Sequence, residues 1–266
     1  MNNLTKNSII FFLHRSTFFL FIFPVVLTYK SNSMLIITLN MIFTYILIYL
    51  FKYIKNNKII NIIINIILSI FSIYMLTLLV NFVKFEYLKK TNNIYIYLLF
   101  IFSIIYIASK KIDSIHKLSF IMFILSILLF FLQTTQLSFS FEISNVKITN
   151  KINFLTILIN SFKLSLFSAI PFITVKENKK IRIYYLISSI TIIATSILVF
   201  NILESNLLYT YKYPLFNLLS YINIFGFMNR LESIFSLMLI TDIILCCIYT
   251  IHYIKSKVHI IHKSHI

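Results

Sequence analysis

Long apolar runs separated by short polar connections dominate the chain. Eight runs stand out, and about 18 apolar residues are enough to mark a transmembrane helix. They cover residues 9–28, 34–50, 59–83, 94–108, 118–137, 152–175, 183–203 and 234–254. The fourth run is the shortest. The pattern predicts an all-α integral membrane protein of about eight transmembrane helices, surrounded by a lipid bilayer and without a separate soluble domain.

Two of the three prolines interrupt the first and the sixth run at similar places. Pro24 lies late in the first run and Pro171 late in the sixth, and the same runs carry the interior basic residues Arg15 and Lys163. Paired interruptions in corresponding helices of two halves are typical of inverted-repeat transporter folds. We therefore predict a transporter-like bundle within one transmembrane domain, 1–266. Its first five-helix repeat covers 1–137, and an incomplete second repeat of three helices covers 151–254.

Composition supports a membrane protein and indicates its orientation. The chain is 59% hydrophobic, and its formal net charge is +17. Because the basic residues gather between apolar runs, they indicate membrane loops rather than a nucleic-acid surface. With the N-terminus inside, 14 of the 24 Lys and Arg lie in inner loops and tails and 8 in outer loops. Both termini are therefore predicted to be cytoplasmic.

Patterns of catalysis and metal binding are missing from the sequence. It has no Gly-rich phosphate loop, no G-x-S-x-G, no H-E-x-x-H and no carboxylate cluster, so we predict neither an enzyme nor a cofactor. Cys246 and Cys247 are adjacent in an apolar run and are interpreted as small apolar fillers. His259, His262 and His265 lie three apart after the last run but have no second ligand cluster. We interpret that segment as a loose basic tail rather than a metal site.

Charged residues inside the runs are candidates for function, since burying a charge in a membrane is costly. Lys163 is near the middle of the sixth run, and Asp242 is the one acid well inside a run. Lys163 could bind a ligand carboxylate, pair with Asp242, or extend along its helix toward the interface. Asp242 could be that partner, a proton or cation site, or a polar residue tolerated in a wet crevice. Arg15 and His14 are close to the start of the first run, where we expect both to extend to the interface.

A resemblance to a known family begins in the polar interval 213–232. Tyr213-Pro214 followed by LFNLLSYINIFGFMNRLESIF resembles a signature of the spore germination permeases. These are the B subunits of GerA-type germinant receptors, in the amino acid–polyamine–organocation superfamily. The matching positions are Tyr221, Ile222, Ile224, Phe227, Arg230, Leu231 and Glu232. The segments AIPF before VKENKK and ASKKIDSIHKL also look like parts of that family.

The resemblance implies a process, a set of partners and a ligand site. The chain would be a membrane subunit that senses a small germinant, such as an amino acid, in a transporter-like pocket. It would assemble with the A and C subunits of a receptor in the inner spore membrane. The alternatives are an amino acid or cation transporter of the same fold and a non-binding membrane scaffold. The expected ligand-binding residues are Thr17, Pro24, Lys163, Ser168, Pro171 and Asp242.

The chain departs from the family pattern in two places. Thr17 and Phe19 stand where the family has glycines before the first proline, so a bulky Phe would occupy ligand space. The family has ten helices, and this chain has eight runs. Within the interval itself, the apolar spacing after Pro214 predicts a short amphipathic helix at the outer membrane face, which the resemblance suggests as a gate or partner surface.

Overall fold

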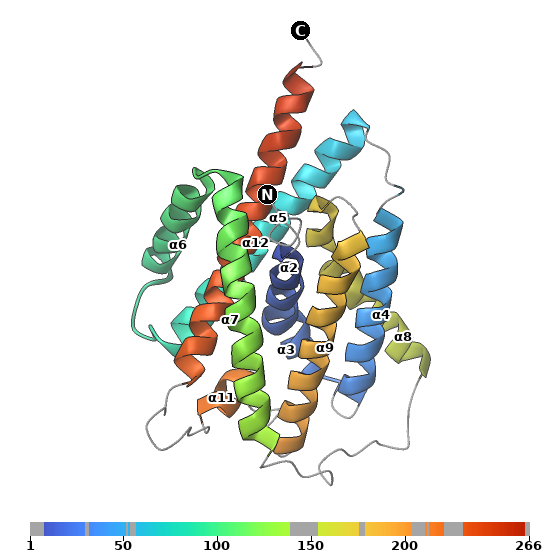
Figure 1. The fold of residues 1–266 in the computed structure, drawn as a ribbon, viewed down its shortest axis with the longest axis vertical. Helices are drawn as coiled ribbons and strands as arrows, with labels where there is room; N and C mark the ends of the chain where they lie inside the picture. The colour runs from blue at the N-terminus through green and yellow to red at the C-terminus, as the bar shows by residue number, and fades with distance from the viewer. Residues whose placement is uncertain are drawn as a thin grey trace.

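Helices make up all the regular structure of the described residues. The computed structural model describes residues 8–29, 32–51, 53, 57–138, 154–175, 179–203, 211, 213–220 and 231–263, and no strand occurs among them. The predicted all-α fold class is confirmed (Figure 1). The elements are α2 (Ile9–Thr17), the π-helix η1 (Phe18–Ile22), α3 (Phe23–Leu27), α4 (Ser33–Phe51), α5 (Lys58–Glu86), α6 (Asn93–Ala108), α7 (Ile112–Ser138), α8 (Phe154–Ala169), the 3-10 helix η4 (Ile170–Thr174), α9 (Lys179–Ile202), α11 (Pro214–Ser220) and α12 (Leu231–Lys263).

Seven of these helical segments are long and apolar enough to cross a membrane. They are Ile9–Leu27, Ser33–Phe51, Ile59–Glu86, Ile112–Leu132, Phe154–Thr174, Arg182–Ile202 and Ser233–Ser256. The fourth predicted run forms α6, which has 16 residues and is the shorter apolar helix of the set. The chain is therefore a multi-pass membrane protein, with seven long helices and one short one in its described part.

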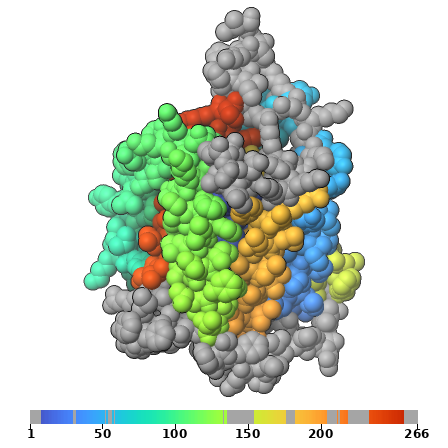
Figure 2. All heavy atoms as spheres, viewed as in Figure 1, coloured from blue at the N-terminus to red at the C-terminus, as the bar shows by residue number. Residues whose placement is uncertain are grey.

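The surface of the bundle is apolar, whereas its interior contains many polar side chains. Along α5, isoleucines at helical spacing are all more than half exposed: Ile59, Ile63, Ile66, Ile70 and Ile73. A continuous apolar stripe of this kind suits lipid rather than water. Serine and threonine side chains are buried between the helices, and most of their hydroxyls donate to a carbonyl one turn earlier. Figure 2 shows α7 and α9 side by side on one face.

The first span occupies the centre of the bundle. Of its most apolar window, 83% of the residues are buried, more than in any other span of the described residues. The α2 helix contacts α12, α9, α7 and η4 (Figure 1). Any polar side chain on α2 therefore meets other helices and not lipid.

Both proline-bearing spans contain a break in the regular α-helix. A proline in a helix lacks an N–H donor, and its ring crowds the carbonyl four residues earlier. For Pro24 that residue is Leu20, which lies inside η1, so the wider π-turn relieves the crowding. Pro171 lies in η4, where the α-helix tightens into a 3-10 turn.

The two broken spans pass each other in opposite directions. The break η1 contacts α8, while η4 at the end of the sixth span contacts α2 at the start of the first. Opposed first and sixth helices are what an inverted repeat requires. The repeat itself, and the division at 137 and 151, stay predictions.

The connections separate to the two ends of the bundle. The C-terminal end of α4, the N-terminal end of α5 and the α6–α7 connection lie at the same end of the bundle as the C-terminal end of α12, while α11 lies at the opposite end (Figure 1). The predicted inner loops thus share one end of the bundle, as the distribution of Lys and Arg indicates. That this end is cytoplasmic stays a prediction. Helix α12 continues to Lys263. The prediction of a loose tail after residue 254 is therefore wrong as far as Lys263, because the backbone there continues the membrane-spanning helix.

Candidate functional site

An ion pair joins the first and last long helices inside the bundle. Nε of Arg15 on α2 donates to Oδ2 of Asp242 on α12 at 2.7 Å, and the two side chains are 9% and 0% exposed. Each charge would be very costly alone in this apolar interior. The pair therefore ties the central helix to α12.

Aromatic rings on α2 cover the guanidinium of Arg15. Its Cζ lies 5.0 Å from the centre of the Phe11 ring and 5.9 Å from that of Phe12. Phe11 is one helical turn before Arg15, so the two side chains share a face. The rings offer their negative faces to the cation and keep lipid tails away from it.

The ion pair uses only part of its hydrogen-bonding capacity. A guanidinium has five N–H donors, and the bond from Nε to Asp242 is the one that it makes within the described part of the chain. Oδ1 of Asp242 is buried and has no partner among the described residues. The terminal nitrogens of Arg15 thus keep donors for another group.

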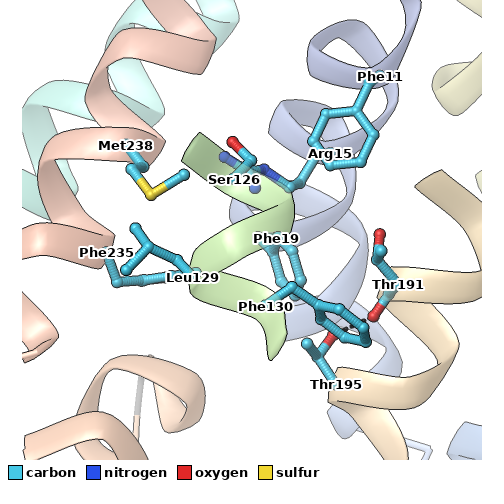
Figure 3. A pocket seen from close by; sticks show the side chains of 10 residues that line it. All are labelled: Phe11, Arg15, Phe19, Ser126, Leu129, Phe130, Thr191, Thr195, Phe235 and Met238. Carbon is cyan, nitrogen blue, oxygen red and sulfur yellow. Dashed lines mark hydrogen bonds between the residues drawn. The ribbon is translucent and has the colours of Figure 1, made fainter. Parts of the chain in front are cut away.

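A pocket lies beside Arg15, between α2, η1, α7, α9 and α12 (Figure 3). We call it the Arg15 pocket; in this conformation its free space holds about one water molecule. Its polar lining consists of Arg15, Ser126, Thr191 and Thr195. Its apolar lining consists of Phe11, Phe19, Leu129, Phe130, Phe235 and Met238.

The hydroxyls of this pocket are oriented as acceptors. Ser126 donates to the carbonyl of Met122 at 2.8 Å, and Thr191 donates to that of Ser188 at 2.8 Å. Thr195 donates to the Thr191 carbonyl at 2.9 Å. Because each proton is used within its own helix, the oxygens keep lone pairs for a donor in the pocket. The lining thus combines one cation, hydroxyl acceptors and aromatic walls, groups that match a small organic anion with an apolar body, and binding one requires the surrounding side chains to move apart.

Of the alternatives for Lys163, the pairing with Asp242 is wrong. Arg15 holds Asp242 instead, and Lys163 is exposed on the outside of α8. The apolar run shows that Lys163 is on a helix but not which side of that helix meets the bundle. Asp242, by contrast, is fully buried, as the cost of an exposed acid in lipid would favour.

The predicted extension of Arg15 and His14 to the interface is also wrong. Arg15 is 8% exposed and His14 is 0% exposed. The His14 ring stacks on Tyr185, with ring centres 4.4 Å apart, and the Tyr185 hydroxyl donates to the carbonyl of Met41 at 2.7 Å. Neither His14 nitrogen has a partner in the described residues. Both side chains are buried because α2 is central, although the run begins only a few residues earlier.

The other predicted ligand residues lie outside the lining of the Arg15 pocket. The Thr17 hydroxyl donates to the carbonyls of its own helix, at Leu13 and His14. Ser168 is buried, and its hydroxyl has no partner within the described ranges. Pro24 lines a second pocket, described below, and Pro171 is buried in η4. The Arg15 pocket is lined by none of the six predicted residues, and their role in binding stays a prediction.

Part of the predicted gate segment is helical. Residues Pro214–Ser220 form α11, with Leu215 and Leu218 buried. Positions 221–230, which carry much of the family resemblance, lie outside the described residues. Comparison with protein-family models, curated proteins and solved structures finds no match to this chain. The resemblance to spore germination permeases therefore rests on the sequence motifs alone.

Proposed function

We propose that this protein is a permease-like membrane protein that binds a small carboxylate-bearing solute in the Arg15 pocket. The observation that carries the proposal is the buried Arg15, which spends one donor on Asp242 and borders the pocket with the rest of its guanidinium. Planar guanidinium groups bind carboxylates through two parallel hydrogen bonds. An ionisable group inside a transmembrane bundle is also a marker of a solute or ion path.

The polar side of the pocket would bind the charged and polar groups of the solute, and the apolar side would contact its hydrocarbon part. The carboxylate would contact Arg15, and a donor group of the solute would face Thr191 or Thr195. Its apolar body would contact Phe130 and Met238. Asp242 has the role of counter-ion: it neutralises Arg15 when the pocket holds no anion, and it limits the affinity for one.

The narrower proposal is a germinant-receptor subunit that senses such a solute and assembles with A and C subunits. It is supported by the motifs in the interval 213–232 and not by the geometry of the pocket. The two broken spans also suit a transporter of the same general type. Flux of the bound solute across proteoliposomes separates these two possibilities, because a sensor binds the solute without sustained uptake. Germination of a deletion strain against a panel of nutrients tests the receptor role directly.

Substitution of Arg15 by lysine tests the binding proposal. Arg15→Lys keeps the positive charge beside Asp242 but removes the planar, bidentate face. We expect purified protein in nanodiscs to bind at least one of a panel of amino acids and short aliphatic carboxylates, and Arg15→Lys to bind it at least about tenfold more weakly. Equilibrium dialysis with labelled solutes measures this.

Lys163→Gln is the matched control, since it removes a basic residue from a span without touching the pocket. It should bind like the parent protein. The proposal is contradicted if the parent binds no carboxylate at millimolar concentration, or if Arg15→Lys binds as tightly as the parent.

A further inference from the structure

A second pocket lies next to the Arg15 pocket, on the side nearer α11. We call it the Pro24 pocket; in this conformation its free space holds about one water molecule. It lies between η1, α3, α5, α11 and α12. Its lining consists of Phe19, Phe23, Pro24, Phe82, Tyr213, Pro214, Leu215, Phe216, Phe235 and Leu239. The lining is almost wholly apolar, so it suits the body of a solute and not its charge.

The two pockets share two lining residues, Phe19 and Phe235. Their rings meet edge to face, with centres 5.9 Å apart and planes at 80°. Phe19 is 8% exposed and Phe235 is 9% exposed. The ring pair therefore borders both spaces.

Both rings are carried by backbone at an irregular or terminal position. Phe19 lies in the π-helix η1, just before Pro24, and single π-turns inside helices occur frequently at functional sites. Phe235 lies in the first turns of α12, which begins at Leu231. Phe19 also packs edge to face on Phe18 and Phe23, and each such ring contact is individually weak.

The Pro24 pocket is bounded by the end of the bundle that carries α11. Tyr213 packs edge to face on Phe82 with ring centres 4.9 Å apart, and Phe216 lies 5.9 Å from the same ring. Burial, and to a smaller extent the charge of Glu86, raise the pKa of Tyr213 to about 12. The phenol is therefore neutral at physiological pH and leaves the lining of this pocket uncharged.

We propose that Phe19 and Phe235 form an aromatic gate, and that solute reaches Arg15 through the Pro24 pocket from the α11 end of the bundle. The inference rests on the proposed function for its solute, a small carboxylate with an apolar body. While the rings are in contact, each pocket holds about one water molecule, so such a solute enters the Pro24 pocket as the side chains lining it move apart. It would pass to Arg15 when Phe19 and Phe235 separate, so the two rings also limit the size of the solute.

Cysteine accessibility tests the gate without any solute. In a Cys246→Ser, Cys247→Ser background, Thr195→Cys reports on the Arg15 pocket. Exposed Lys90 and Lys110, changed to cysteine in separate chains, mark the α11 end and the opposite end. The full-length variants are reconstituted in liposomes and treated with a small membrane-impermeant thiol reagent from either side.

We expect Thr195→Cys to react from the same side as Lys90→Cys, and at least about tenfold faster when Phe19→Ala or Phe235→Ala removes the ring contact. Phe71→Ala is the matched control: Phe71 is 2% exposed on α5 and packs on Phe167, and it is not among the residues described as lining either pocket. Phe19→Leu and Phe235→Leu keep more of the side-chain volume, and replace the alanine variants if those do not fold.

Reaction of Thr195→Cys from the Lys110 side alone overturns the proposal. An equal rate of reaction in the Phe19→Ala and Phe71→Ala variants overturns it as well. Because the reagent replaces the solute, the result is separable from the binding test. Gated labelling without binding of any carboxylate would leave the gate standing and sink the proposed function. Carboxylate binding without gated labelling would support the proposed function and contradict the gate.

Discussion

The first and the sixth span share a sequence pattern but have opposite surroundings. Each is an apolar run with an interior basic residue and a late proline. In the first, Arg15 is buried and paired with Asp242; in the sixth, Lys163 is exposed on the outer side of α8. The difference teaches that a charge in an apolar run has no fixed environment until the position of its helix is known. Arg15 is on the central helix, and Lys163 is on the outward face of a peripheral one.

The two spans also respond differently to their prolines. The span with Pro24 widens into a π-turn before the proline, and the span with Pro171 tightens into a 3-10 turn around it. The first break presents Phe19 to both pockets. The second ends its span among buried residues, with the Thr174 hydroxyl donating to the Pro171 carbonyl at 2.7 Å.

The largest expected effect comes from breaking the buried pair of the first span. Arg15→Ala leaves Asp242 as an uncompensated buried charge, so we expect the free energy of unfolding to fall by about 3–5 kcal/mol. The double variant Arg15→Met, Asp242→Leu removes both charges and should recover most of that loss. Reversible denaturation in mixed micelles measures both. A single variant as stable as the parent, or a double variant less stable than the single, would contradict the role of the pair.

A smaller effect of the opposite sign is expected at the neighbouring position. His14→Phe keeps the stack on Tyr185 and removes two buried nitrogens that have no partner in the described residues. We expect the free energy of unfolding to rise by about 1–3 kcal/mol, since unsatisfied buried polar groups are costly. The same denaturation measurement applies, with Phe12→Leu as the control for a change of ring packing on the same helix. A decrease in the free energy of unfolding would contradict the prediction, because it would mean that the His14 imidazole makes a favourable interaction that Phe cannot replace.

The smallest expected effect is in the sixth span. Lys163→Leu should change the free energy of unfolding by no more than about 0.5 kcal/mol, as for other surface positions away from special features. Solute binding should also stay unchanged. A loss comparable to that of Arg15→Ala would mean that Lys163 has a partner, and the contrast between the two spans would fail.

The sequence by itself determined the helices, because each crosses an apolar medium and must bury its own backbone hydrogen bonds. Six of the seven long spans agree with the predicted runs within three residues at each end, whereas the span predicted for 118–137 covers Ile112–Leu132. Helix α11 begins at Pro214, as its spacing indicates. The two prolines also mark the breaks, since a missing donor is a local property of the chain.

Only the tertiary structure decided which polar residues face one another. Lipid and a protein interior are both apolar, so hydropathy does not tell a lipid-facing lysine from a buried arginine. The partner of Asp242 lies 227 positions away in the sequence, and no local pattern encodes that distance. Packing places α2 at the centre of the bundle. For this reason Arg15, His14 and Phe19 are buried in the interior, although they are close to the start of the chain.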